Sequence, residues 1–311
     1  MADEIQEKRK ISRQEAEEEA RILLDKAGKI RIDPEFRLFA TMNPAEYAGR
    51  KILSPALMNR FRVKWIDDYF YYEKLAILDQ ITRRRFPYAE VVLGRNYGYA
   101  GQVFSSHDEI RFFAEKGMLV GTEAGNYVYT FREILRLVRR LNELIRNYKD
   151  SGLVLDEETL KDMLCQEFVQ IHGDRIRDRA TRDTFEECLH TLPEFREDDD
   201  LQIEIQDNIV KFGELRLERH SGRGPYVPGE WARLTHTRTT LSILKKLAKT
   251  ILSGEKPLLV GPTGSAKTSY IRYLAYLMRA NFYRINLDAQ TDTSELIGKQ
   301  VPKENSEGFE W

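Results

Sequence analysis

The stretch that decides the fold is Pro257-Leu-Leu-Val-Gly-Pro-Thr-Gly-Ser-Ala-Lys-Thr268, followed by an amphipathic run that starts at Ser269. Its first part, Leu258 to Val260, is apolar and predicts a short strand that leads into a tight glycine-containing turn. A helix is expected to open at Lys267. Strand, loop and helix in this order are the context that a phosphate-binding loop requires, so the pattern predicts phosphate binding here.

The residue types in this loop suit that chemistry. Gly261 and Gly264 let the backbone wrap closely enough for its N–H groups to point at phosphates, and the helix N-terminus adds partial positive charge. Lys267 is expected at the β- and γ-phosphates, with the hydroxyl of Thr268 on Mg²⁺, which predicts Mg-ATP as the ligand. The alternative is a glycine-rich turn that contains a lysine by chance. The residues expected to line the nucleotide are Gly261, Pro262, Thr263, Gly264, Ser265, Ala266, Lys267 and Thr268.

Ala266 stands where glycine normally precedes the lysine of such a loop. If the residue has helical φ, its methyl group costs little; if φ is positive, alanine costs roughly 1 kcal/mol or more. We expect the helical case.

Composition sets the limits for the rest of the chain. In 311 residues there is room for about two domains. Lys and Arg total 49 against 50 for Asp and Glu, so a net charge of −1 gives no global attraction to nucleic acid or to an anionic membrane. No signal peptide or bilayer-length apolar run is found, and the 2 cysteines and 5 histidines make no metal-binding spacing. These features predict a reduced, soluble, cytoplasmic protein without structural zinc.

The N-terminal part predicts a charged helix and two short strands. Ser12-Arg-Gln-Glu15 has the form of a capping box, at the start of a helix that is expected to end near Gly28. Phe36-Arg-Leu-Phe-Ala-Thr-Met-Asn43-Pro reads as an apolar strand that ends in a polar residue. A short helix capped by Ser54 is expected within Leu53-Ser-Pro-Ala-Leu-Met-Asn-Arg60-Phe. A second strand is expected at 63–66. Taken alone, an asparagine such as Asn43 is more often a turn former, and an arginine such as Arg60 is more often a partner of the helix C-terminus.

Together, Phe36 to Asn43 and the run from Gly49 to Phe61 resemble the second half of an AAA+ ATPase core of the dynein-related, midasin and MoxR type. The resemblance implies that Asn43 is the sensor-1 residue, which helps to place the attacking water. It also implies that Arg60 is the arginine finger, which reaches the nucleotide of a neighbouring module and stabilises transition-state charge.

From Tyr72 to about Asp150 the pattern is helical, with apolar faces from Glu73 to Arg85 and from Phe131 to Tyr148. In the same family a small helical lid follows the core and contributes a sensor-2 arginine near a helix start. Thr130-Phe-Arg132 matches that position, with the alternative that Arg132 is a surface residue beside Glu133. The glycines and tyrosines between these helices are expected to serve hairpins or packing.

Residues 151 to about 234 carry no assignable chemistry. They predict helices at 156–168 and 179–192, one or two strands within 203–217, and a turn-rich linker at 221–229. A helix from Leu234 then leads to the phosphate loop. After it, a helix at 270–280 and a strand at 283–287 are expected, and Asn286 to Gly298 again resembles a midasin-type module. Alanine before the lysine also resembles this clade, which includes the minichromosome-maintenance helicases.

In one AAA+ module the phosphate loop precedes sensor 1, the finger and the lid, whereas in this chain it follows them. We therefore expect an α/β protein made of P-loop NTPase (AAA+) sheet-and-helix core pieces with a helical lid between them. No acidic Walker-B run follows an apolar strand where one is expected. The chain thus resembles a slice of a tandem-module protein, with Walker-B residues beyond Trp311. The expected parts are 1–66, the end of a first core; 67–150, the lid; 151–234, a mixed insert; and 235–311, the start of a second core.

This organisation predicts an ATP-hydrolysing module of a chaperone-like motor that remodels a protein complex. Its expected partners are neighbouring AAA+ modules in a ring and a protein substrate, with no membrane. Two alternatives stay open. A nucleic-acid translocase of the helicase clade requires basic pore hairpins; the chain has no such concentration, although Arg83-Arg-Arg85 is a small one, so nucleic acid is not favoured. A structural module that binds nucleotide without hydrolysis fits Ala266 and the missing Walker B.

Overall fold

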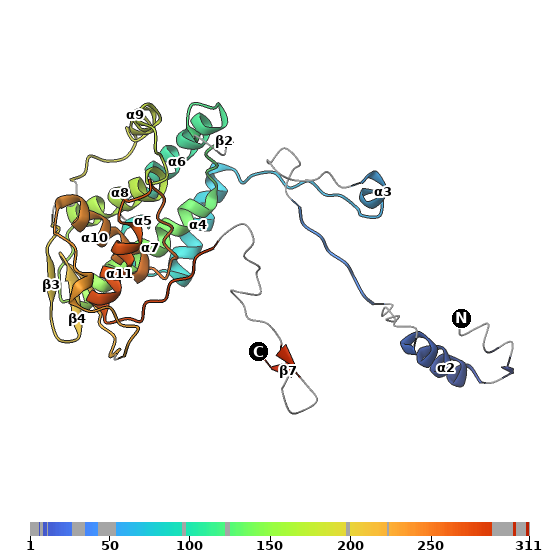
Figure 1. The fold of residues 1–311 in the computed structure, drawn as a ribbon. Helices are drawn as coiled ribbons and strands as arrows, with labels where there is room; N and C mark the ends of the chain where they lie inside the picture. Colours follow the sequence, from blue (N-terminus) through green and yellow to red (C-terminus); the bar gives the residue numbers. More distant parts are fainter. Residues whose placement is uncertain are drawn as a thin grey trace. The chain divides into compact units, whose positions relative to one another are not determined.

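The computed structural model describes residues 6, 9–10, 12–26, 35–42, 54–94, 98–121, 125–196, 200–222, 224–287, 301–302 and 309–310. The chain divides into two compact units, Met1–Asp67 and Asp68–Trp311 (Figure 1). Each unit is described by itself below. The boundaries expected near residues 150 and 234, between the lid, the insert and the second core, are not tested by this division and stay predictions.

The first unit contains two helices with the expected N-terminal signals. α2 is Arg13–Lys26, and its capping box forms as predicted: the backbone N of Ser12 donates to Glu15 Oε2 at 2.9 Å, and Glu15 N donates to Ser12 Oγ at 3.3 Å. α3 is Pro55–Met58, where Ser54 Oγ accepts from Leu57 N. Proline at the first helical position suits this start because its missing N–H would have no partner there.

Two segments of the first unit that the sequence predicts as strands are not strands. Residues 36–42 and 63–66 have no strand assignment, and their apolar side chains are exposed: Phe39 at 88% and Ile66 at 83%. A strand exists only where a neighbour accepts and donates its backbone hydrogen bonds. Among the described residues, no other strand pairs with these segments.

The second unit is mainly helical and holds the hydrophobic core. Its helices, in chain order, are α4 Tyr71–Arg85, α5 Glu90–Leu93, α6 Tyr99–Glu115, α7 Phe131–Asp150, α8 Glu157–Gly173, α9 Arg179–Glu187, η1 Glu230–Ala232, α10 Arg238–Leu252 and α11 Lys267–Met278. Its strands are β1 Val120–Gly121, β2 Gly125–Asn126, β3 Ile203–Ile205, β4 Ile209–Phe212, β5 Leu215–Glu218, β6 Val301–Pro302 and β7 Phe309–Glu310. Among the described helices, none combines the length and apolar character that crossing a bilayer demands.

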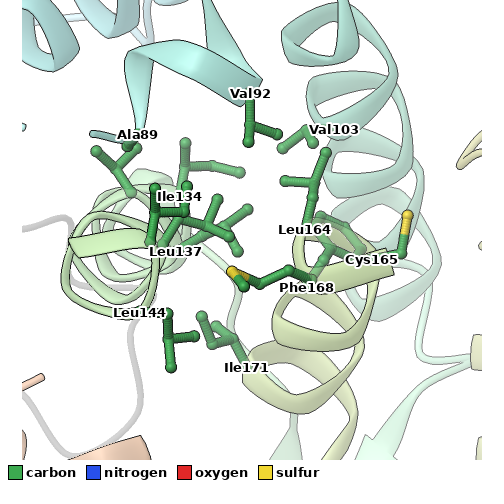
Figure 2. Packing of buried hydrophobic residues seen from close by; sticks show 14 of the residues in the cluster. Ala89, Val92, Val103, Ile134, Leu137, Leu144, Leu164, Cys165, Phe168 and Ile171 are labelled. Carbon is green, nitrogen blue, oxygen red and sulfur yellow. The ribbon is translucent and has the colours of Figure 1, made fainter. Parts of the chain in front are cut away.

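The core is built around α7. Apolar residues recur along this helix at helical spacing, which gives it a continuous buried face. α8 and α10 both pack against it (Figure 1). Figure 2 shows side chains of α7, such as Leu137 and Leu144, facing those of α8, such as Phe168 and Ile171. The lid helix of the sequence prediction is therefore the central helix of this unit.

A three-stranded antiparallel meander, in the order β3-β4-β5, covers part of this helical core. The sequence predicts one or two strands here, and the structure has three short ones. Buried Val210 and Phe212 alternate with half-buried residues along β4, as expected for a sheet with one face on the core. Asn147 of α7 ties β5 down, since its side chain donates to Arg216 O at 2.6 Å and accepts from Arg216 N at 3.0 Å.

The two strands expected on either side of the phosphate loop are also unpaired in the described residues. Residues 257–260 and 281–287 are extended or irregular, and Leu258 is 87% exposed. The central parallel sheet of an α/β core forms between segments distant in sequence, so each strand depends on neighbours. The turn-rich segment expected as a linker contacts the second of these stretches, where Phe282 N donates to Tyr226 O at 2.8 Å.

Candidate nucleotide-binding site

The loop between residue 261 and the start of α11 is held by short-range contacts of Ser265. Its hydroxyl donates to Pro262 O at 2.8 Å and its backbone N donates to the same oxygen at 3.3 Å. Gly264 has φ +85°, a conformation that L-residues rarely adopt. Gly261 faces the other side of the turn, and a Cβ on it would lie 3.1 Å from Ser265 Oγ. Both glycines are therefore required by the shape of the loop.

Lys267 is the first residue of α11, and its side chain folds back over the loop. Its Nζ donates to Gly261 O at 2.9 Å, to Pro262 O at 2.6 Å and to Ser265 Oγ at 3.3 Å. One positive charge thus lies at the mouth of the loop, next to the N-terminal end of a helix, which also attracts anions. A phosphate bound here would exchange these carbonyl contacts of the ammonium group for charge-assisted hydrogen bonds.

Ala266 corrects one sequence expectation. It has φ 57° and ψ 18°, in the left-handed region, where we expect helical φ from the sequence. The expectation is wrong because Ala266 lies just outside the helix, so that its φ is set by the turn before α11 and not by the helix. The Cβ of an L-residue is crowded by the following carbonyl in this conformation, at a cost of about 1–2 kcal/mol.

We therefore expect Ala266→Gly to raise the free energy of unfolding by about 0.5–1 kcal/mol, since the relieved strain exceeds the entropy that glycine loses on folding. Urea denaturation followed by circular dichroism measures the change. Ala275→Gly, in the interior of α11, is the matched control and should lower stability by about 1 kcal/mol. Equal destabilisation by both substitutions would show that Ala266 is not strained.

The residues expected to hold ATP and Mg²⁺ fit a phosphate group. Thr263 and Thr268 are exposed on the loop and on the first turn of α11. Gly261 keeps the turn narrow, Gly264 turns the backbone, and Lys267 supplies the charge. Backbone N–H groups at the start of a helix and an ammonium group are the donors that phosphate oxygens accept.

The three residues assigned from the AAA+ resemblance have different positions. Asn43 lies outside the described residues. Arg60 is exposed in the first unit, just after α3, and its backbone N donates to Leu57 O at 3.1 Å. Arg132 lies in the second unit, in the first turn of α7, and its side chain is exposed. Arg60 and the phosphate loop belong to different units.

Local contacts explain why Arg132 is exposed while its neighbour is not. Thr130 and Glu133 form a capping box at the start of α7: Thr130 N donates to Glu133 Oε2 at 2.7 Å, and Arg132 N donates to Thr130 Oγ1 at 3.3 Å. Arg175, at 3.0 Å, is the ion-pair partner of Glu133. Burial alone would raise the pKa of Glu133, but the Thr130 backbone and Arg175 hold it below its ordinary value. Among the described residues, no ion pair engages the Arg132 guanidinium.

Comparisons with known proteins agree with this geometry. Residues 256–311 match the family model of the AAA domain, dynein-related subfamily. The chain is 26% identical over 320 residues to a midasin of Dictyostelium discoideum. This alignment covers 93% of this chain and 5% of that protein. It is 26% identical over 293 residues to a midasin of Giardia intestinalis, covering 90% of this chain and 5% of the relative. No solved structure matches the chain.

These matches decide the class of protein. The chain spans about 5% of the length of each midasin, and the alignments run through nearly all of it. The family match also gives the α/β class of the AAA+ core that the sequence predicts. Residues 256–311 therefore match a dynein-related AAA domain, and the chain is similar to midasins over nearly all of its length.

Proposed function

We propose that the loop from Gly261 to Thr268 binds the phosphates of ATP with Mg²⁺, as one nucleotide site of an ATP-driven motor. The observation that carries the proposal is the ammonium group of Lys267, which lies over a glycine-turned loop at the start of α11. Lys267 neutralises phosphate charge, and the hydroxyl of Thr268 is a ligand for the metal ion. Mg²⁺, when bound, draws charge from the β- and γ-phosphates.

The remaining residues belong to the module that precedes this loop, and Arg60 reaches from it to the nucleotide of a neighbouring module. Asn43 orients water, Arg60 contributes the finger and Arg132 contacts the nucleotide from the lid, each by its match to the family pattern. Nucleotide sites of tandem AAA+ modules lie between modules, so each site takes groups from more than one part of the chain. The exposed guanidinium groups of Arg60 and Arg132 support this assignment, because both are accessible to a partner.

We further propose that hydrolysis drives remodelling of a protein complex. The midasin relatives support a motor module of this kind, and the near-zero net charge does not favour nucleic acid as substrate. The partners are neighbouring AAA+ modules in a ring and a protein substrate in reduced, cytoplasmic surroundings.

Steady-state phosphate release tests the proposed division of the site between modules. We expect this chain to bind Mg-ATP weakly and to hydrolyse it slowly or not at all, because its sequence has no acidic Walker-B run at the position where the AAA+ pattern requires one. Phosphate release should stay far below the roughly 1 s⁻¹ that marks a slow but ordinary enzyme. Turnover at or above that rate, abolished by Lys267→Ala, would contradict the division.

A further inference from the structure

Four charged side chains are buried together where α7, α8 and α10 meet. Arg140 of α7 donates to Glu167 of α8, from Nη1 to Oε2, at 3.1 Å. Lys249 of α10 donates from Nζ to the other oxygen of Glu167 at 2.8 Å. Arg140 also binds Glu255, just after α10, through Nε at 3.2 Å and Nη2 at 3.0 Å, both to Oε2. The positive and negative charges balance within this cluster.

Burying such a cluster costs desolvation free energy, so its main effect is to fix the arrangement of the helices that carry it. The side chain of Glu167 is 0% exposed, and those of Lys249 and Arg140 are 6% and 11% exposed. Burial would raise the pKa of Glu167, yet Lys249 and Arg140 lower it, so the carboxylate is charged. Desolvation offsets much of the Coulomb attraction in buried pairs, and the pairs still demand one arrangement of the helices that carry them.

Glu255 connects this cluster to the phosphate loop. It lies between the end of α10 and Pro257. Residues 257–260, which lead into the loop, are called the lead-in segment. Its backbone N donates to Thr250 O at 3.0 Å, and Thr250 Oγ1 accepts from Arg140 Nη2 at 3.3 Å. The start of the lead-in segment is therefore held to α10 by the backbone of Glu255 and to α7 by its side chain.

The same helix carries the lid arginine. Arg132 lies in the first turn of α7, and Arg140 follows about two turns, or roughly 12 Å, further along. A helix of this length moves as a rigid rod between such points. A shift of Glu255 against Arg140 therefore moves the end of α7 at which Arg132 lies.

The second oxygen of Glu255 supplies a contact that can change. Glu255 Oε1 is buried and has no hydrogen-bond partner among the described residues. Arg136, one turn before Arg140 on α7, holds its Nε 3.8 Å from this oxygen, and its side chain is 47% exposed. A buried acceptor without a hydrogen bond costs about 1–3 kcal/mol. A small approach of α7 to the lead-in would convert this long ion pair into a hydrogen bond.

We propose that Glu255 is a positioning residue that couples the phosphate loop to α7. This inference rests on the proposed function. Nucleotide at Lys267 draws the lead-in segment toward α7, so that Glu255 Oε1 and Arg136 Nε form a hydrogen bond. This contact steadies α7 and thereby the position of Arg132. Nucleotide at this site thus shifts the position of Arg132 in the lid of the preceding module, and α7 carries the effect.

Hydrogen exchange of the full chain, read by mass spectrometry with and without saturating Mg-ATP, tests the coupling. In the wild type we expect ATP to slow exchange in the loop with α11 and, about fivefold or more, in residues 132–140 of α7. In Glu255→Gln, ATP should still protect the loop, while the protection of α7 is lost. Arg136→Gln, at a half-exposed position outside the buried cluster, should give the same loss and serves if Glu255→Gln fails to fold.

Controls separate this inference from the proposed function. Lys246→Ala, which breaks an exposed ion pair of α10 with Asp174 (2.6 Å), should keep both kinds of protection. Lys267→Ala should lose both. A wild type that ATP protects nowhere contradicts the proposed function itself. Protection of the loop without α7 in the wild type, or α7 protection that persists in both Glu255→Gln and Arg136→Gln, overturns the coupling alone.

Discussion

Lowering the pH from 7 to 5 is expected to reduce the free energy of unfolding by about 4 kcal/mol, because two buried histidines must stay neutral in the folded chain. His107 of α6 and His172 of α8 are 2% and 0% exposed. Their rings meet with His107 Nδ1 3.0 Å from His172 Nε2. The ring of His172 also stacks on Phe168, with centroids 4.0 Å apart.

The hydrogen bonds of this pair define its protons. His172 Nδ1 lies 2.9 Å from Phe168 O, an acceptor, so Nδ1 of His172 donates. In the neutral ring, Nε2 then accepts, and His107 Nδ1 is its donor. A proton added to His172 Nε2 would set two N–H groups against each other in the core. Protonation of this ring therefore breaks the bond that joins α6 to α8.

The direction of the pH effect follows from the pKa values. Burial lowers the pKa of His107 to about 4, and burial together with His107 lowers that of His172 to about 3. Unfolded histidine has a pKa near 6.5, so below about pH 6.5 the unfolded chain binds more protons than the folded one. The stabilisation is complete above this range and is lost as the pH falls toward 4. With both histidines charged only in the unfolded state, the slope approaches about 2.7 kcal/mol per pH unit.

Urea denaturation at pH 7, 6 and 5 measures this slope. His107→Gln keeps a donor for His172 and should halve the pH dependence, since one titrating ring remains. A His107→Gln chain with the wild-type slope would contradict the assignment to this pair.

Helices of both units could be predicted from local sequence. Apolar spacing predicts a helix from Phe131 to Tyr148, and the structure has α7 there, with Thr130 and Glu133 as its capping box. Likewise Ser12 with Glu15, and Ser54 with Pro55, cap helices as predicted. These features depend on residues within one or two turns, so the chain alone encodes them.

Strands, in contrast to helices, could not be predicted reliably from local sequence. Leu258–Val260 and the stretch from Phe36 to Met42 have the composition of buried strands, yet neither is paired in the described residues. Hydrogen-bonded pairing depends on a neighbour that local sequence does not specify. The same limit applies to Asn43, whose role depends on a strand end outside the described residues.

The buried charges were missed for another reason. Glu167 occupies a position between apolar residues of α8, and Arg140 one between apolar residues of α7. A charged residue on an otherwise apolar face is a detectable signal, but the sequence does not reveal its partner. Only the packing of α7, α8 and α10 brings Arg140, Glu167 and Lys249 together.

The error at Ala266 has a similarly local cause. As the first residue of α11 it would have helical φ, whereas outside the helix its φ is set by the preceding turn, and the sequence does not fix a helix start to one residue. Lys267 and Gly264, in contrast, could be identified from the loop pattern alone, because few other residues fit a phosphate-binding turn.

Calorimetric titration of Mg-ATP into the chain and its Lys267→Ala variant tests the central claim, that this loop binds nucleotide. Lys267 supplies the charge over the loop, so its loss should weaken binding about 100-fold, equivalent to about 2.7 kcal/mol of charged hydrogen bonds. Lys246→Ala, which removes an exposed positive charge from α10, should bind as the wild type does. Equal affinity of the wild type and Lys267→Ala, or no binding by either, would contradict the account.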